Sequence, residues 1–585
     1  MNKVIIRNGT IIDGSGRAPF VADLTYRDGI ITAIGKDLDG SAHREIDATG
    51  FIVSPGFIDT HTHMDGQLFW DKEASSSAWH GCTTVITGNC GYSLAPLKDG
   101  DASYPLSLMT GVEQIPRKTL EAGVPWDWTT FGEYTKSLER SGLAVNASTY
   151  VGLPVVRHSV MGADAFEGVA SEAQLDAMRT TLHTALDEGA LGISMNRLPI
   201  DRDDMGRTAA GLNCDWSELR AMAEVLREHP GTMVQCVPAF ILPFEGFTDK
   251  DKVEQQEWIE VARAAGRPMV WSPLIEIWKD AHLEYLRAAK ASGVQMWGCS
   301  NAVPICVNST FETENLFGTI PGLERIFSVG VNERIEMFKR PSFREEARKI
   351  LGTEQFSAYP NRAIDEVGNT ILGTPFTYRW ADMWRLPPPP AAFTLSGPSV
   401  LQESRASGKH PVDVILDGAV ESGLKEFLTI FPFGYSGELL ASVINDPHVV
   451  LGANDTGAHI KFLSCAGSTQ LLGDLVRRTG SIGLTEGVHM LTGRLAKVFG
   501  LSDRGVLRPG LASDIVIFDA AKIDSFTPYV THDLPNGDHR FVQRATGIHS
   551  VIVNGRTIQH QGKATGELPG RYLRPSEMAA RSAAA

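Results

Sequence analysis

The stretch that decides the fold reads EAQLDAMRTTLHTALDE at residues 172–188, ALGIS at 190–194, WSELRAMAEVLRE at 216–228 and TMVQC at 232–236. The two longer segments have the pattern of helices, and the two shorter ones are the compact apolar runs typical of buried strands. Strands that alternate with helices predict a parallel sheet whose neighbouring strands are joined by helical crossovers.

The same alternation continues in both directions along the chain. Further strand candidates lie at 83–88, 143–152, 268–272, 295–298 and 449–452. For an α/β chain of this length a closed (β/α)8 barrel is the economical architecture, with catalytic groups at the carboxyl ends of the strands. We predict this barrel over residues 56–499, with insertions. One of them, at 98–127, is expected over the barrel mouth, and the sequence leaves its role open.

Both ends of the chain contain short β-branched runs between turn residues. They lie at 4–14, 29–35 and 50–53 near the start and at 512–519 and 549–558 near the end. Each set is too small to be stable alone, so we expect the two sets to pair into one β-sandwich. This domain is predicted to comprise residues 1–55 and 500–575, and residues 576–585 are predicted to be a frayed tail.

Composition limits the function classes. The chain of 585 residues has 54 basic and 69 acidic residues and a net charge of −15, which argues against nucleic acid or an anionic membrane as the partner. Seven scattered cysteines predict reduced thiols rather than a disulfide framework. Neither a secretory leader nor a membrane-spanning run is recognisable. We therefore expect a cytoplasmic enzyme with a small-molecule substrate, and leave homo-oligomerisation open.

The strongest chemical signal is PGFIDTHTHMD at residues 55–65. If residues 57–61 form a barrel strand, its two-residue period puts His61 and His63 on the same side. Both imidazoles could then bind one metal ion at the barrel mouth. The alternative interpretation is two unrelated polar histidines.

Two later segments offer further metal ligands. Cys90, in TGNCGYS at 87–93, could bind zinc as a thiolate, although a lone cysteine is more often a small buried residue. Asp455, in GANDTGAH at 452–459, could bind the metal and take a proton from water, or it could cap a helix. His459 could contact the substrate or be an ordinary histidine at a helix start.

These motifs, together with GVLRPGLASDIV at 505–516, resemble the amidohydrolase superfamily, specifically its branch of N-acyl-D-amino-acid deacylases, the D-aminoacylases. The resemblance spans nearly the whole chain. It implies a metal-bearing, distorted, TIM-like (β/α)8 barrel beside a β-sandwich, which hydrolyses amide bonds with a zinc-activated water. In that branch a cysteine replaces the carboxylated lysine of many relatives, and Cys90 matches that cysteine.

One departure from the branch concerns a second metal ion. The D-aminoacylases carry metal-binding histidines at the ends of the fifth and sixth strands, where this chain reads VQCVP at 234–238 and VWSPL at 270–274. Neither segment contains a histidine, and Cys236 alone could not rebuild the site. We therefore predict one zinc ion with the ligands His61, His63, Cys90 and Asp455. The carboxylate of Asp455 is also the predicted general base.

The leading functional prediction is a zinc-dependent hydrolase of N-acyl amide bonds. Arg157, His158 and Arg197 are candidates for binding an anionic substrate group, and each is as readily structural. Tryptophans near the strand ends would suit a bulky acyl group, so one alternative is a specialised hydrolase of an aromatic amide, an ester or an activated carbon–carbon bond. The other alternative is a barrel that lost its catalytic metals and only binds a ligand.

Overall fold

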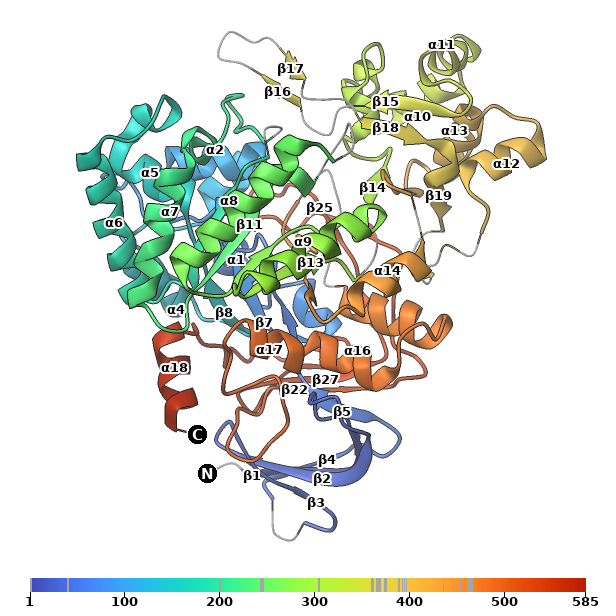
Figure 1. Ribbon diagram of the computed structural model, residues 1–585. Helices are drawn as coiled ribbons and strands as arrows, with labels where there is room; N and C mark the ends of the chain where they lie inside the picture. Colours follow the sequence, from blue (N-terminus) through green and yellow to red (C-terminus); the bar gives the residue numbers. More distant parts are fainter. Residues whose placement is uncertain are drawn as a thin grey trace.

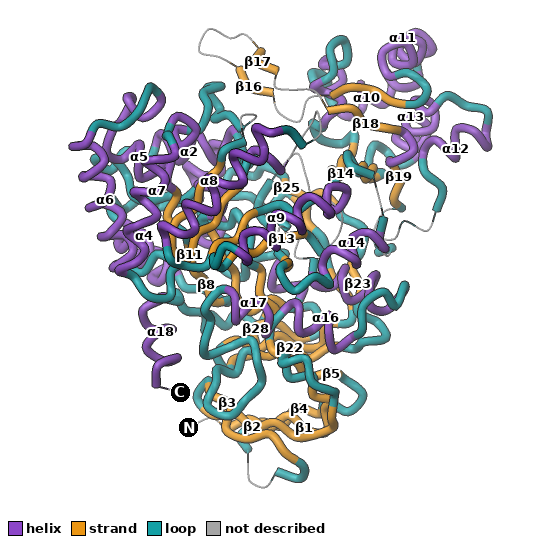
Figure 2. The backbone as a smooth tube through the Cα atoms, viewed as in Figure 1, coloured by secondary structure: helices purple, strands orange, loops and turns teal. Residues whose placement is uncertain are grey.

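The computed structural model describes residues 3–584 apart from 39–41, 199–200, 242–246, 303–305, 359–361, 365–369, 373–375, 388–389, 392, 394, 396, 435, 453 and 460–466. The α/β class is confirmed, because helices lie around a set of parallel strands (Figure 1), and helices and strands both occur throughout the chain (Figure 2). None of the described helices is both long and apolar enough to cross a bilayer.

The parallel strands form two sheets. One consists of β6 (Phe57–Asp59), β7 (Cys82–Thr87) and β8 (Asn146–Thr149). The other has the order β21-β13-β12-β11-β10-β9, with β9 (Val151–Gly152), β10 (Gly192–Asn196), β11 (Met233–Val237), β12 (Met269–Trp271), β13 (Met296–Ser300) and β21 (Val449–Leu451). Each strand predicted for this region is therefore present at or close to its expected position.

Contacts join the two sheets at both edges. Only Tyr150 separates β8 from β9 in the chain. At the other edge, Thr60 Oγ1 donates a hydrogen bond to the carbonyl oxygen of Leu451 at 3.0 Å. The backbone N–H of His63 donates to the carbonyl oxygen of Thr456 at 2.8 Å. The chain that follows β6 thus lies against the chain that follows β21.

Apolar side chains from all of these strands, or from residues next to them, pack together in one buried cluster. Its members from the strand region are Ile58, Ile86, Tyr150, Leu191, Met233, Val270, Cys299 and Val450. Because side chains alternate between the faces of a strand, the residue two positions further along points the same way. A polar residue two positions after a cluster member therefore points to the same interior, closer to the carboxyl end of its strand.

Helices cover the outer face of the parallel strands (Figure 1). They include α5 (Leu153–Met161), α6 (Glu172–Asp187), α7 (Trp216–Val225), α8 (Asp249–Ala265) and α9 (Lys279–Ala291). The start of α6 is fixed by a capping box in which Ser171 and Gln174 satisfy each other's backbone N–H groups. The predicted helix at 172–188 is thus present, and the one at 216–228 consists of α7 and a short 3-10 turn.

Strands from both ends of the chain pair in one nine-stranded sheet, so the two ends meet as expected, while the β-sandwich stays a prediction. It contains β1 (Lys3–Ile11), β2 (Phe20–Arg27), β3 (Ile30–Gly35), β4 (Arg44–Asp47), β5 (Ile52–Pro55), β22 (Ile515–Phe518), β27 (Ile548–Val553), β28 (Arg556–His560) and β29 (Lys563–Ala564). The antiparallel pair of β5 and β22 joins the two ends. The segment expected to be a frayed tail instead contains helix α18 (Pro575–Ala584).

The chain segment between β13 and β21 forms a second hydrophobic core. Its buried residues run from Phe311 to Ile430 and form a cluster separate from the one around the parallel strands. The elements around it include β14 (Val307–Thr310), α10 (Val331–Lys339), α11 (Pro341–Leu351), α12 (Val400–Ser407), α13 (Pro411–Glu421) and β20 (Phe427–Ile430). In Figure 1 this unit lies to the upper right of the parallel strands. The sequence predicts insertions in this region without revealing that one has its own core.

Candidate metal centre

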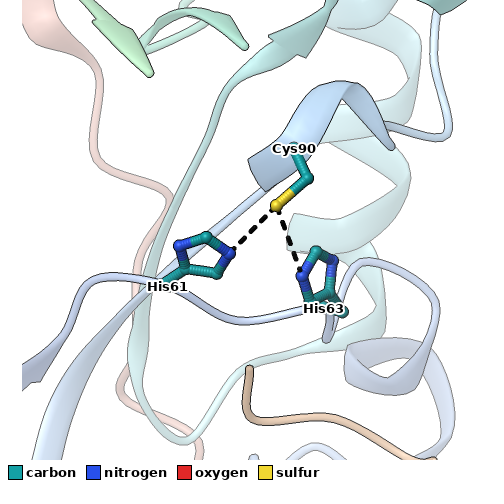
Figure 3. A group of neighbouring side chains, drawn as sticks. All are labelled: His61, His63 and Cys90. Carbon is teal, nitrogen blue, oxygen red and sulfur yellow. Dashed lines mark hydrogen bonds between the residues drawn. The ribbon is translucent and has the colours of Figure 1, made fainter. Parts of the chain in front are cut away.

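Three of the predicted ligands meet just beyond β6 and β7. Strand β6 ends at Asp59, so His61 and His63 lie in the segment after it, yet both rings point toward the Cys90 sulfur (Figure 3). His61 Nε2 lies 3.1 Å and His63 Nε2 3.9 Å from Cys90 Sγ. The three donor atoms lie within 4.8 Å of one another, and all three side chains are buried. One metal ion can therefore contact all of them.

The chemistry of these side chains suits a cation. Burial lowers the pKa of His63 to about 4, which keeps its ring in the neutral form that binds metals. Burial also raises the pKa of the Cys90 thiol well above its usual value. The thiolate form therefore needs a positive charge close to the sulfur, and a divalent cation supplies one.

The backbone holds Cys90 in a left-handed conformation with φ 58°. Residues other than glycine rarely adopt this conformation, and it persists where surrounding contacts enforce it. The N–H of Cys90 donates to Gln235 Oε1 at 2.8 Å, and the N–H of Gly91 donates to Ser194 Oγ at 3.0 Å. Position 88, two residues before Cys90, requires glycine, because a Cβ there would lie 2.3 Å from the carbonyl oxygen of Tyr150.

Asp455 faces the same cluster from the loop after β21. Its Oδ1 lies 3.1 Å from His61 Nε2 and 3.5 Å from His63 Nε2. Partial loss of hydration would raise the pKa of Asp455, but its contacts with the two histidines hold it well below its usual range. The side chain is 51% exposed, whereas those of His61 and His63 are only 5% and 1% exposed. A helix capped by Asp455 would extend into residues 460–466, which lie outside the described residues.

Asp59, which sequence reasoning did not single out, ties the two ligand segments together. Its Oδ2 accepts hydrogen bonds from Ser77 Oγ at 2.7 Å and from Thr456 Oγ1 at 2.9 Å. Because Thr456 follows Asp455 directly, this contact fixes the aspartate loop beside the histidine segment. Burial raises the pKa of Asp59 to about 6.

Gln235 and Ser272 lie in the two segments, 234–238 and 270–274, in which the D-aminoacylase resemblance expects metal-binding histidines. Gln235 Nε2 donates to Ser272 Oγ at 3.1 Å, and Ser272 Oγ lies 3.2 Å from His61 Nδ1. Both residues follow inward-facing Met233 and Val270 by two positions, which explains why they face the ligand cluster.

Cys236 belongs to the opposite face of its strand. It is completely buried in the large core between the strands and the helices, together with Trp271, its register partner on β12. Among the described residues, the cluster of possible metal ligands includes Cys90 but not Cys236. The alternation of the strand therefore turns this thiol away from the candidate centre.

Three predicted substrate-binding residues have local structural partners. Arg157 on α5 is completely buried, 3.6 Å from Glu218 Oε1, and donates to the carbonyl oxygen of Gly168 at 2.6 Å. The His158 ring stacks on Tyr104 with a centroid distance of 4.3 Å. Arg197 lies over the Trp216 ring at 4.5 Å. These contacts account for the side chains structurally, and their binding of substrate stays a prediction.

His459 and the unpredicted Glu113 lie directly behind the candidate ligands. Glu113 comes from the predicted insertion at 98–127, between α2 (Ser103–Gly111) and α3 (Arg117–Gly123). His459 Nδ1 lies 2.6 Å from the carbonyl oxygen of Glu113, and its Nε2 lies 2.7 Å from that of Asp455. His459 thus supports the aspartate loop, while its predicted contact with substrate stays a prediction. No motif around Glu113 signalled its position.

Comparison with known proteins finds relatives over almost the full length. Residues 44–304 match the model of the amidohydrolase family. D-aminoacylase of Alcaligenes xylosoxydans xylosoxydans is 27% identical over 97% of this chain and 97% of its own length. N-acyl-D-aspartate deacylase of the same organism is 26% identical, over 98% of this chain and 95% of its own.

Solved structures share the fold. A crystal structure of D-aminoacylase superposes with a TM-score of 0.62 at 23% identity, covering 98% of this chain and 99% of that one. N-acyl-D-glutamate deacylase from Bordetella bronchiseptica, solved with zinc and a phosphonate inhibitor, has the same TM-score of 0.62, identity and coverage.

Proposed function

We propose that the protein uses one zinc ion to hydrolyse the N-acyl amide bond of a small molecule. The reason is that the chain is an amidohydrolase of the D-aminoacylase branch. It is a hydrolase of carbon–nitrogen bonds other than peptide bonds. The observation that carries the proposal is the convergence of two buried imidazoles and a buried thiol within 4.8 Å. Nitrogen and sulfur donors of this kind suit zinc. The proposed ligands are His61, His63, Cys90 and Asp455.

The roles of the proposed ligands follow from how far each side chain is exposed to solvent. Zinc at these ligands would lower the pKa of water and polarise the scissile carbonyl. Asp455, half exposed while the histidines are buried, is the ligand that water and substrate can reach. Its carboxylate accepts a proton from the attacking water and returns it to the leaving nitrogen as the carbon–nitrogen bond breaks. Four firm protein ligands would close a tetrahedral site, so we infer that Asp455 binds most weakly.

We also infer that the two parallel sheets form one distorted (β/α)8 barrel within residues 56–499. The contacts that join β8 to β9 and β21 to the segment after β6 support this, as does the shared interior cluster. Residues 1–55 and 500–575 then form the proposed β-sandwich domain beside it. The ligands would lie at the carboxyl ends of barrel strands, where enzymes of this architecture place their active sites.

Activity against matched panels of N-acyl-D-amino acids, N-acyl-L-amino acids and aryl amides tests the proposed reaction. We expect the zinc-loaded protein to release free amine from at least one N-acyl-D-amino acid, and to do so faster than from its L-enantiomer. Turnover of aryl amides alone would instead favour the specialised hydrolase. No turnover on any panel despite bound zinc would contradict the proposal.

We propose a single ion because Gln235 and Ser272 are already engaged in hydrogen bonds. Gln235 contacts Ser272 and the backbone N–H of Cys90, and Ser272 contacts His61. Placing histidines at both positions in the double variant Gln235→His/Ser272→His is expected to raise the zinc content from one to two ions per chain, since it adds two imidazole donors beside Cys90 and His61. Elemental analysis after gel filtration measures this ratio. Two tightly bound ions in the unaltered protein would contradict the single-ion proposal.

A further inference from the structure

We propose that Glu113 is a positioning residue that orients His63 for metal binding, and that this is a function of the insertion at 98–127. The inference rests on the proposed zinc site. It starts from a difference between the two ligand histidines, each of which turns Nε2 toward the other ligands. His61 Nδ1 has a partner in Ser272 Oγ at 3.2 Å, whereas His63 Nδ1 has no hydrogen-bond partner among the described residues.

The carboxyl group of Glu113 lies within ion-pair distance of that unpartnered nitrogen. Its Oε1 lies 3.5 Å from His63 Nδ1, and its side chain is only 7% exposed. A histidine that binds a metal through one ring nitrogen usually donates the other N–H to a carboxylate, carbonyl or water, which fixes the ring and raises its basicity. Glu113 is placed to give His63 this partner, as Ser272 Oγ is placed for His61.

Glu113 also reaches the second ligand segment. Its Oε2 lies 3.7 Å from His459 Nδ1, and its carbonyl oxygen lies 2.6 Å from the same nitrogen. The other nitrogen of His459 contacts the carbonyl oxygen of Asp455 at 2.7 Å. One residue of the insertion therefore supports both the histidine segment and the aspartate loop.

The insertion is anchored firmly enough to hold a side chain in place. Arg117 at the start of α3 forms an ion pair with Asp204 at 2.7 Å, and Ser107 on α2 donates a hydrogen bond to the same carboxylate. Thr119 donates to Asn536 at 2.7 Å. These contacts lie on both sides of Glu113 in the chain, so its position is determined from either direction.

Zinc affinity of full-length Glu113 variants tests this role directly. We expect Glu113→Ala to bind zinc about 10- to 100-fold more weakly in competition with a chelator, the loss typical of such outer partners. Glu113→Gln should lie between it and the unaltered protein, because an amide oxygen still accepts the His63 N–H without the charge. The cobalt(II)-substituted Glu113→Ala protein should have an altered visible spectrum, since the His63 donor is no longer held.

Glu121→Gln is the matched control, because Glu121 lies in α3 of the same insertion and is exposed. It should leave zinc affinity and the cobalt spectrum unchanged. If both Glu113 variants bind zinc as tightly as the unaltered protein, the positioning role is wrong while the proposed function stands. If the unaltered protein binds no zinc at all, both are overturned. Should Glu113→Ala fail to fold, Glu113→Gln alone decides, because it preserves side-chain volume.

Discussion

Replacing Cys90 with alanine is expected to remove the bound zinc and to lower kcat/KM by about 1,000-fold or more. The sulfur is the atom that both His61 Nε2 and His63 Nε2 approach, so its loss leaves two imidazoles and a half-exposed carboxylate to hold the ion. Losing the ion forfeits several kcal/mol of stabilisation of the developing charge, and each 1.36 kcal/mol corresponds to about tenfold in rate. Zinc content and steady-state kinetics on the same preparation measure both effects.

Cys236→Ala is the matched control for the loss of a buried thiol. Cys236 is buried like Cys90, but the alternation of its strand places it on the face opposite Met233 and Gln235. Its replacement should cost some stability through a small cavity while leaving zinc content and kcat unchanged. A Cys90→Ala protein that retains one zinc ion per chain, with normal turnover, would rule out the proposed site.

Replacing Asp455 with asparagine is expected to lower kcat by about 100- to 10,000-fold while most of the zinc is retained. Asparagine has the same shape and an oxygen that can still face the ion, but its amide cannot accept and return a proton. Because the two histidines and Cys90 are unaffected by this change, we expect only a modest weakening of zinc binding. The result therefore separates proton transfer from metal binding.

The kinetic measurement is made with zinc in excess, so that any loss of affinity does not contribute to the loss of kcat. Asp164→Asn is a suitable control, because Asp164 is an exposed aspartate in a short turn after α5. It should retain both activity and zinc. A kcat of Asp455→Asn within tenfold of the unaltered protein would assign the proton transfer to another group.

Local sequence patterns were sufficient for the parallel strands and for two of the helices between them. The parallel strands and helices α6 and α7 could be predicted because apolar spacing along a few residues determines which local structure buries them. The pairing of the two chain ends followed from the small size of each set of strands. The second core between β13 and β21 could not be predicted, since its residues are spread over more than 100 positions without a repeated pattern.

The sequence by itself determined the donor types of the site: a histidine pair two residues apart, a cysteine between glycines and an aspartate after an apolar strand. It also indicated that the usual second pair of histidines is absent. Only the tertiary structure decided what stands behind these donors, namely Ser272 at His61, Glu113 at His63 and Asp59 at the aspartate loop. The physical reason is that ligand identity is a property of single residues, whereas an outer partner is defined by the approach of segments far apart in the chain, which no local periodicity encodes.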